Sequence, residues 1–180
     1  MLQLRDEVTL APLLMEHAAR MWSWMTDPAV SEGVGLRENP SLEKSQDWIR
    51  RALTDPTVRA YAIVLGSEHV GNAILDRLDV HLQSARLSIY VGEKSARGCG
   101  VGQTALHRLT RVGFHELGLW KIWLTVHAEN HRAIASYLKV GFVLEGILRD
   151  EFLLRGRRLP VVYMGLLRHD YLACDKEANP

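Results

Sequence analysis

A glycine-rich loop in the middle of the chain constrains the fold more than any other feature of the sequence. The segment Arg97-Gly98-Cys99-Gly100-Val101-Gly102 follows a strand-like run, 87–91, and precedes an amphipathic run typical of a helix, 101–117. Glycines let backbone amides approach a ligand closely, and the first turn of a helix offers unpaired N–H donors at the positive end of its dipole. The loop therefore predicts a nucleotide-type cofactor held by its phosphates. An ordinary glycine-rich strand-to-helix turn is the alternative.

The glycine spacing excludes the two best-known nucleotide-binding loops. A dinucleotide-binding loop needs G-x-G-x-x-G, and Gln103 stands where the third glycine is required. A Walker loop needs a closing Gly-Lys-Ser/Thr, and no Lys-Ser/Thr pair follows Gly102. The pattern that remains is Arg97-x-x-Gly100-x-Gly102.

Length and composition predict a single domain over residues 1–174, followed by a disordered polar tail at 175–180. A chain of 180 residues with 47% hydrophobic composition is long enough for one substantial core. A net charge of +1 gives no support for a nucleic-acid partner. Two cysteines, Cys99 and Cys174, are too few for a disulfide scaffold, which predicts a cytoplasmic location. No apolar run suits a signal peptide or a membrane span, so no membrane partner is predicted.

Hydrophobic periodicity predicts an α/β chain, with α+β character in a mixed sheet that carries helices on its faces. The expected helices are 15–25, 41–53, 101–117 and 130–140, and the expected strands are 61–65, 70–75, 85–91, 120–126, 143–155 and 157–167. The first two strands are joined by Gly66-Ser67, a two-residue turn that favours an antiparallel hairpin.

Three separated segments resemble the GNAT family of N-acetyltransferases. They are the loop 97–102, the segment Asn130-His131-Arg132-Ala133-Ile134-Ala135-Ser136-Tyr137, and Gly141-Phe142 four residues later. The C-terminal segments 141–149 and 161–167 resemble the C-terminal part of one branch of this family. That branch includes the ribosomal-protein N-terminal acetyltransferases and the amino-sugar acetyltransferases. The resemblance implies the GNAT fold, a mostly antiparallel sheet splayed between its fourth and fifth strands. Acetyl-CoA, the acetyl donor, is expected to insert between 88–92 and 122–126.

The resemblance also implies which residues hold the cofactor. Amides near Tyr90 and Val91 are expected to hold the pantetheine and thioester, and those of 98–102 the diphosphate. The full expected set is Tyr90, Val91, Gly92, Arg97, Gly98, Cys99, Gly100, Val101, Gly102, Asn130, Ser136 and Tyr137. Cys99 is interpreted as a spacer in the loop, because transfer in this family is direct from the thioester.

Acetyl transfer to an amine needs a base, polarisation of the thioester carbonyl, and a proton for the departing thiolate. Tyr137 matches the family's general acid, and a core aromatic is the alternative interpretation of this residue. The candidates for the base are Glu93, Glu32, or a water held by Ser88 or Tyr90. A solvated surface role is the alternative for each glutamate. An amide near Val91 is the expected oxyanion donor.

The acceptor site is expected between 21–37 and the strands, with Trp22, Glu32, Arg37, Asp76, Ser88 and Tyr90 as the candidate substrate-binding residues. Trp22 and Trp24, two positions apart, cannot share a helix face. Either one lines a pocket while the other packs inward, or both are half-buried against the sheet. Arg37 suits a phosphate on the acceptor, with simple solvation as the alternative. His127 and His131 straddle a strand-to-helix junction, and no metal site is predicted.

Three functions remain open on the sequence. The first is direct transfer of acetyl, through a ternary complex, to a small-molecule primary amine such as a nucleotide-linked amino sugar. The second is acetylation of a protein N-terminus, for example that of a ribosomal protein. The third is a non-catalytic acetyl-CoA-binding module. The two long C-terminal strands also suit pairing across subunits in a homodimer.

Overall fold

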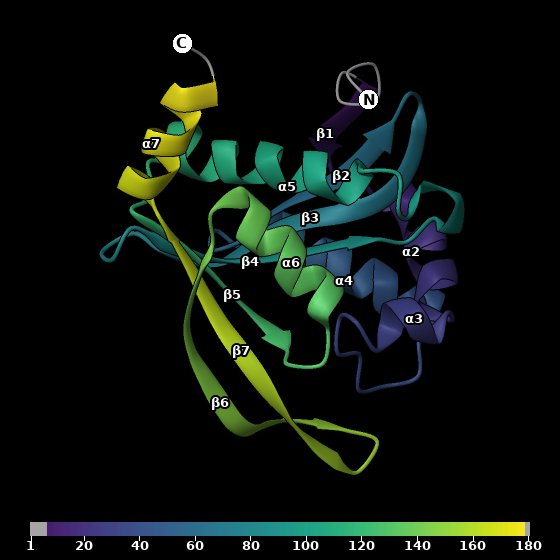
Figure 1. Cartoon of the computed structure of the whole chain (residues 1–180). Coiled ribbons are helices and arrows are strands. Elements are labelled where there is room, and N and C mark those ends of the chain that lie inside the picture. Colours follow the sequence, from purple (N-terminus) through teal and green to yellow (C-terminus); the bar gives the residue numbers. More distant parts are fainter. Residues whose placement is uncertain (1–6, 179–180) are drawn as a thin grey trace.

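A seven-stranded mixed sheet forms the centre of the computed structural model, which describes residues 7–178 (Figure 1). The strands are β1 Val8–Pro12, β2 Arg59–Leu65, β3 Glu68–Asp79, β4 Ser84–Val91, β5 Lys121–His127, β6 Val143–Leu154 and β7 Arg157–Leu167. Their order across the sheet is β1-β2-β3-β4-β5-β7-β6. Only β4 and β5 run parallel, and the other neighbours are antiparallel. The predicted fold class is confirmed.

The helical segments are η1 Met15–His17, α2 Ala18–Met25, α3 Pro28–Ser31, α4 Leu42–Thr54, η2 Lys94–Ala96, α5 Val101–Arg111, η3 Val112–Glu116, α6 His131–Val140 and α7 Arg168–Ala178. Ser41 caps α4 by accepting a hydrogen bond from the Lys44 amide at 3.2 Å. The helix predicted over 101–117 divides into α5 and the single π-helical turn η3. Helix α7 covers the first four residues of the predicted tail, and residues 179–180 lie outside the described residues.

Two hydrophobic clusters cover the two faces of the sheet. The larger one packs α5 and α6 on one face, with Leu87 of β4 and Val126 of β5 among its members. The smaller one packs α2 and α4 on the other face, where Trp24 and the Tyr90 ring meet. Because side chains alternate along a strand, these contacts assign the faces of β4 and β5. Ser88 and Tyr90 point to the face of α2 and α4.

The sheet splits between β4 and β5. The two strands pair only at Ser84↔Lys121, Ala85↔Ile122 and Arg86↔Trp123, while β5 continues to pair with β7 as far as His127. Beyond Arg86 the edge of β4 that faces β5 has no strand beside it. The predicted splay is confirmed, and it begins after Trp123, one residue beyond the start of the expected segment 122–126.

No helix within residues 7–178 is both long enough and apolar enough to cross a membrane.

Candidate active site

The glycine loop forms a cradle of free amides at the start of α5. Gly98 and Gly100 have φ values of 81° and 90°, a left-handed backbone that glycine adopts without steric cost. None of the amides of residues 98–103 donates a hydrogen bond to an acceptor within the described part of the chain. These N–H groups lie at the positive end of the α5 dipole, which suits a diphosphate. The loop therefore fits the phosphate-binding role predicted for it.

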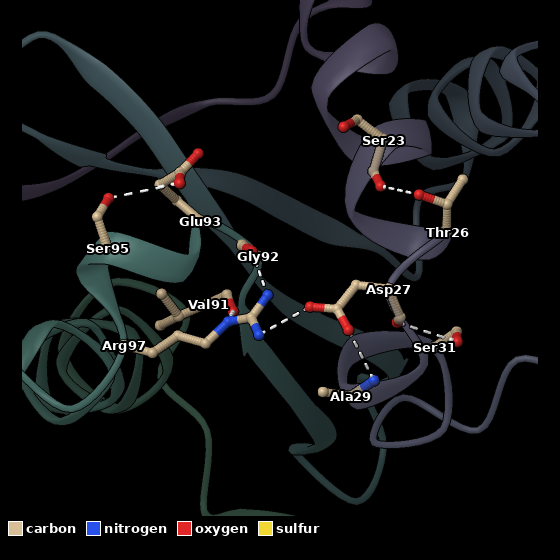
Figure 2. A network of polar contacts seen from close by, with 10 residues as sticks. All are labelled: Ser23, Thr26, Asp27, Ala29, Ser31, Val91, Gly92, Glu93, Ser95 and Arg97. Atoms are coloured by element: carbon tan, nitrogen blue, oxygen red, sulfur yellow. Dashed lines mark hydrogen bonds and ion pairs between the residues drawn. The ribbon is translucent and has the colours of Figure 1, made fainter.

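Arg97 holds the end of β4 through contacts with Val91, Gly92 and Asp27 (Figure 2). Its Nε donates to the carbonyl oxygen of Val91 at 3.1 Å, and its Nη2 donates to that of Gly92. Its Nη1 forms an ion pair with Oδ2 of Asp27 at 2.9 Å. The guanidinium is thus committed to protein acceptors. These contacts make Arg97 a positioning residue for the end of β4, and its role in cofactor binding stays a prediction.

Arg132 is the cation that the sequence interpretation missed. Its Nη2 lies 4.0 Å from the position that a Cβ on Gly98 would occupy. The guanidinium forms no ion pair or side-chain hydrogen bond with another residue of 7–178. It stands in the first turn of α6, in the same segment that carries the family resemblance. The sequence signal that could have identified Arg132 was its position in the first turn of the helix that follows β5, the splayed strand.

The contact between Asp27 and Arg97 predicts a pH-dependent contribution to stability. The Arg97 guanidinium, followed by the Ala29 amide, holds the pKa of Asp27 below its ordinary value. A lowered pKa stabilises the folded state above the unfolded pKa of about 3.9, and this stabilisation is lost as the pH falls through the folded pKa.

Asp27→Asn keeps an N-capping side chain on α3 and removes only the charge. We expect this variant to melt below the wild-type temperature at pH 7, and the difference to shrink once the pH drops below about 3.9 and to vanish below the lowered folded pKa. Circular dichroism melts across this range measure it. A difference that does not change with pH would contradict the assignment.

The main chain of β4 lines the split, whereas the Tyr90 side chain does not. The Tyr90 hydroxyl accepts a hydrogen bond from Nδ2 of Asn72 at 2.6 Å, and burial raises the pKa of this phenol. Its ring packs edge-on against Trp24 with centroids 6.3 Å apart. The predicted contact of this side chain with a substrate or a catalytic water stays a prediction, and the protein already holds its ring and its hydroxyl. The Gly92 amide donates to Val70 on β3, so by strand alternation the Val91 amide faces the opening.

Tyr137 lies on the sheet-facing side of α6, which covers the split (Figure 1). The side chain is 9% exposed, and burial alone raises the pKa of its phenol to about 12. The Phe142 ring lies across it with centroids 5.8 Å apart. Its hydroxyl makes no hydrogen bond to another residue of 7–178. A protonated hydroxyl on a buried ring, without a protein partner, suits a group that acts on a bound molecule.

Asn130 and Ser136 have local partners on α6. Oδ1 of Asn130 accepts from the Ala133 amide at 3.1 Å and caps the helix, which leaves its Nδ2 as the donor for a cofactor. The Ser136 hydroxyl donates to the carbonyl oxygen of Arg132 at 3.0 Å. The carbonyl oxygen of Ser136 accepts from Nε2 of Gln103 at 3.4 Å, a contact that links α6 to α5.

The predicted acidic groups have partners already. Glu32 forms an ion pair with Nη1 of Arg155 at 3.0 Å. Asp76 holds Arg86 through two hydrogen bonds of 2.8 and 2.6 Å, and this contact raises the pKa of the arginine. Glu93 lies past the end of β4, where it accepts from Ser95 at 3.4 Å on the loop side of the network (Figure 2). None of the three presents a free carboxylate to the split.

A cavity of about 610 Å³ lies between segment 25–40 and the tip of the β6–β7 hairpin, 153–156. Arg37 lines it and also stacks over the Phe152 ring, 4.9 Å from the centroid. Trp24 packs inward at 6% exposure, whereas Trp22 is 39% exposed. The division between the two tryptophans is confirmed for their burial. A contact of Trp22 with substrate stays a prediction, as does that of Ser88, which is partly exposed beside the split.

Comparison with known proteins assigns this arrangement. The family model of the "Acetyltransferase (GNAT) domain" matches residues 7–143. The spermidine N(1)-acetyltransferase of Escherichia coli (strain K12) is 25% identical over 94% of this chain and 85% of that protein. The putative ribosomal N-acetyltransferase YdaF of Bacillus subtilis is 26% identical over 95% of this chain and 91% of its own.

A solved structure has the same fold. Spermidine N-acetyltransferase from Vibrio cholerae, in complex with CoA and spermine, superposes with a TM-score of 0.86 at 25% identity over 93% of this chain and 99% of that one. Another structure of the Vibrio enzyme, with a TM-score of 0.80, is dodecameric.

Proposed function

The chain belongs to the GNAT acetyltransferases, whose acetyl donor is acetyl-CoA, and from this premise we propose that its acceptor is the primary amine of a small molecule. One observation carries the proposal. The structure combines a split sheet and free loop amides with a cavity lined by segment 25–40 and a hairpin tip. A bounded cavity suits a small acceptor, whereas a peptide needs an open groove along an extended strand.

The proposed roles of the residues follow from their placement. The amides of 98–102 and the Arg132 guanidinium hold the phosphates of the cofactor. Asn130 binds the pantetheine arm through its Nδ2. The bound cofactor supplies an acetyl group activated as a thioester. The Val91 amide, facing the split, stabilises negative charge on the acetyl oxygen. Tyr137 holds a proton at its hydroxyl for the departing sulfur.

The charges around the cavity favour an acceptor with fewer positive charges than spermidine. Of the charged lining residues, Arg155 is paired with Glu32, and Glu38 is paired with Lys44. Paired carboxylates attract a polycation weakly, because their partner cations offset the field. Arg37 adds a further positive charge at the cavity. These contacts support an amino sugar that carries a phosphate or nucleotide.

A panel of amines with detection of free CoA tests this proposal. The panel contains a nucleotide-linked amino sugar, spermidine, and a peptide with the N-terminus of a ribosomal protein. We expect thiol release with the amino sugar to exceed release with the other two at least about tenfold in kcat/KM, or about 1.4 kcal/mol. Preference for the peptide would support the protein N-terminus, the alternative that similarity to YdaF favours. Cofactor binding without release across the panel would support a non-catalytic module.

We also propose a homo-oligomer in the cytoplasm. Strand β6 is an edge of the sheet, and it exposes Val143, Leu144, Ile147 and Leu153 by 46% or more. An exposed apolar edge strand is suited to pairing with a second copy. Sedimentation velocity is expected to give a mass at least twice 20.4 kDa, and a monomer at micromolar concentration would contradict this part. The two cysteines of the sequence support the location.

A further inference from the structure

The structure leaves the general base unassigned among the predicted candidates. A protonated amine cannot attack a thioester, so a group near the split has to take its proton. The Glu32 and Asp76 carboxylates are paired with arginines, and the Tyr90 hydroxyl is buried against Asn72. Glu93 lies toward the phosphate loop. The base has to come from another element.

The register of β4 and β5 places His127 at the split. The last paired residues, Arg86 and Trp123, point to the same face of the sheet because neighbouring side chains in a ladder share a face. Counting four residues along both parallel strands brings Tyr90 and His127 to the same level on either side of the opening. His127 is the last residue of β5, and since Val126 packs in the α5 and α6 cluster, His127 lies on the opposite face, that of α2 and α4.

The surroundings of His127 hold its ring and leave one nitrogen for proton exchange. The Phe152 ring packs edge-on against it, with centroids 4.8 Å apart. Phe152 is in turn held by Gly35, where a Cβ would come within 2.6 Å of its Cζ, and by Arg37 on its face. Nδ1 of His127 is buried and has no hydrogen-bond partner among residues 7–178. Nε2 is therefore the nitrogen that exchanges a proton.

We propose that His127 is the general base that takes the proton of the acceptor ammonium. This proposal rests on the acetyltransferase function proposed above. Nε2 accepts this proton, and the freed lone pair of the amine forms the C–N bond. The C–S bond breaks with its electron pair on sulfur, which takes a proton from Tyr137. The phenolate regains a proton from the new amide nitrogen, and His127 releases its own to solvent. Every proton of the ammonium is thus accounted for.

Several charged or titratable groups stand on the elements around His127. They are Arg37 on the Phe152 ring, Glu151 next to Phe152 on β6, Glu129 and His131 after β5, and Tyr163 on β7. Histidine is the side chain with an ordinary pKa nearest neutral pH, which suits a base that is recycled at each turnover.

The pH dependence of kcat/KM for His127→Gln tests the assignment. In the wild type, we expect kcat/KM to level off above neutral pH, because the base deprotonates a bound ammonium. In the variant, we expect a loss of about 100-fold at pH 7 and a rise of about tenfold per pH unit up to the pKa of the acceptor amine. Added imidazole is expected to restore part of the activity of His127→Ala.

Matched controls separate catalysis from folding. His131→Gln removes a neighbouring exposed histidine, and we expect wild-type kcat/KM and an unchanged profile. Acetyl-CoA affinity, measured by calorimetry, is expected to stay unchanged in His127→Gln. A variant that keeps the wild-type profile, or loses activity equally at every pH without imidazole rescue, would overturn the base role. A wild type that transfers acetyl to no amine would overturn the proposed function and this role with it.

Discussion

Replacement of Tyr137 by phenylalanine is expected to lower kcat by at least about 100-fold, the usual contribution of a general acid. The residue fits this role because burial raises its pKa to about 12, which keeps the phenol protonated at neutral pH. A thiol with a reference pKa of about 8.5 is normally the stronger acid of the two. The same desolvation that acts on the phenol also disfavours a thiolate in the split. It raises the pKa of the thiol toward that of the phenol.

Phenylalanine keeps the ring that packs against Phe142 and removes only the hydroxyl. We therefore expect acetyl-CoA affinity within about twofold of wild type, since the change removes a group that acts on the departing sulfur. Steady-state assays and calorimetry on one protein preparation measure both quantities. Undiminished kcat would make Tyr137 a core aromatic, the alternative that its burial in the cluster also allows.

Gly102→Asp is expected to weaken acetyl-CoA binding by about 100-fold without destabilising the protein. Gly102 has ordinary helical geometry in the first turn of α5, and a Cβ there would meet Cγ2 of Val91 at 3.4 Å, a normal contact. A carboxylate near the helix start interacts favourably with the dipole. The same carboxylate repels a phosphate at about 5 Å by about 3 kcal/mol, at an effective dielectric constant of about 20.

Gly102→Asn is the matched control, because it has the same shape without the charge. We expect its affinity for acetyl-CoA to fall much less than that of Gly102→Asp, and the gap between the two variants to shrink at high salt. Equal losses in both variants would assign the effect to shape. Unchanged affinity in both would place the diphosphate away from this loop.

The sequence predicted features that depend on local patterns. Alternation in 85–91 and the glycines of 98–102 were enough to place a strand, a loop and a helix in order. The position of the split followed from the family resemblance carried by 130–137. Three elements were missed for local reasons. Strand β1 is five residues long and ends at Pro12, α3 is a single turn, and α7 has only weak amphipathic character.

The roles that depend on contacts between distant residues were not predictable. Arg97 contacts the end of β4 and pairs with Asp27, which is 70 residues away in the sequence. By strand alternation Tyr90 points away from the α5 and α6 cluster. Its ring packs against Trp24 of α2, and its hydroxyl accepts a hydrogen bond from Asn72 of β3. The His127 ring packs against Phe152, which lies 25 residues later in the sequence. Phe152 in turn packs against the 35–37 segment. Spacing within one segment carries no information on such contacts.

Calorimetric titration of the purified wild-type protein with acetyl-CoA tests the central claim most directly. The free amides of the loop and the open edge of β4 predict saturable binding at one site per chain, weakened by Gly102→Asp and retained in Tyr137→Phe. Free CoA is expected to compete for the same site, because it carries the same phosphates. No heat of binding with either ligand up to about millimolar concentration, where an interaction of about −4 kcal/mol is still detected, would contradict the account.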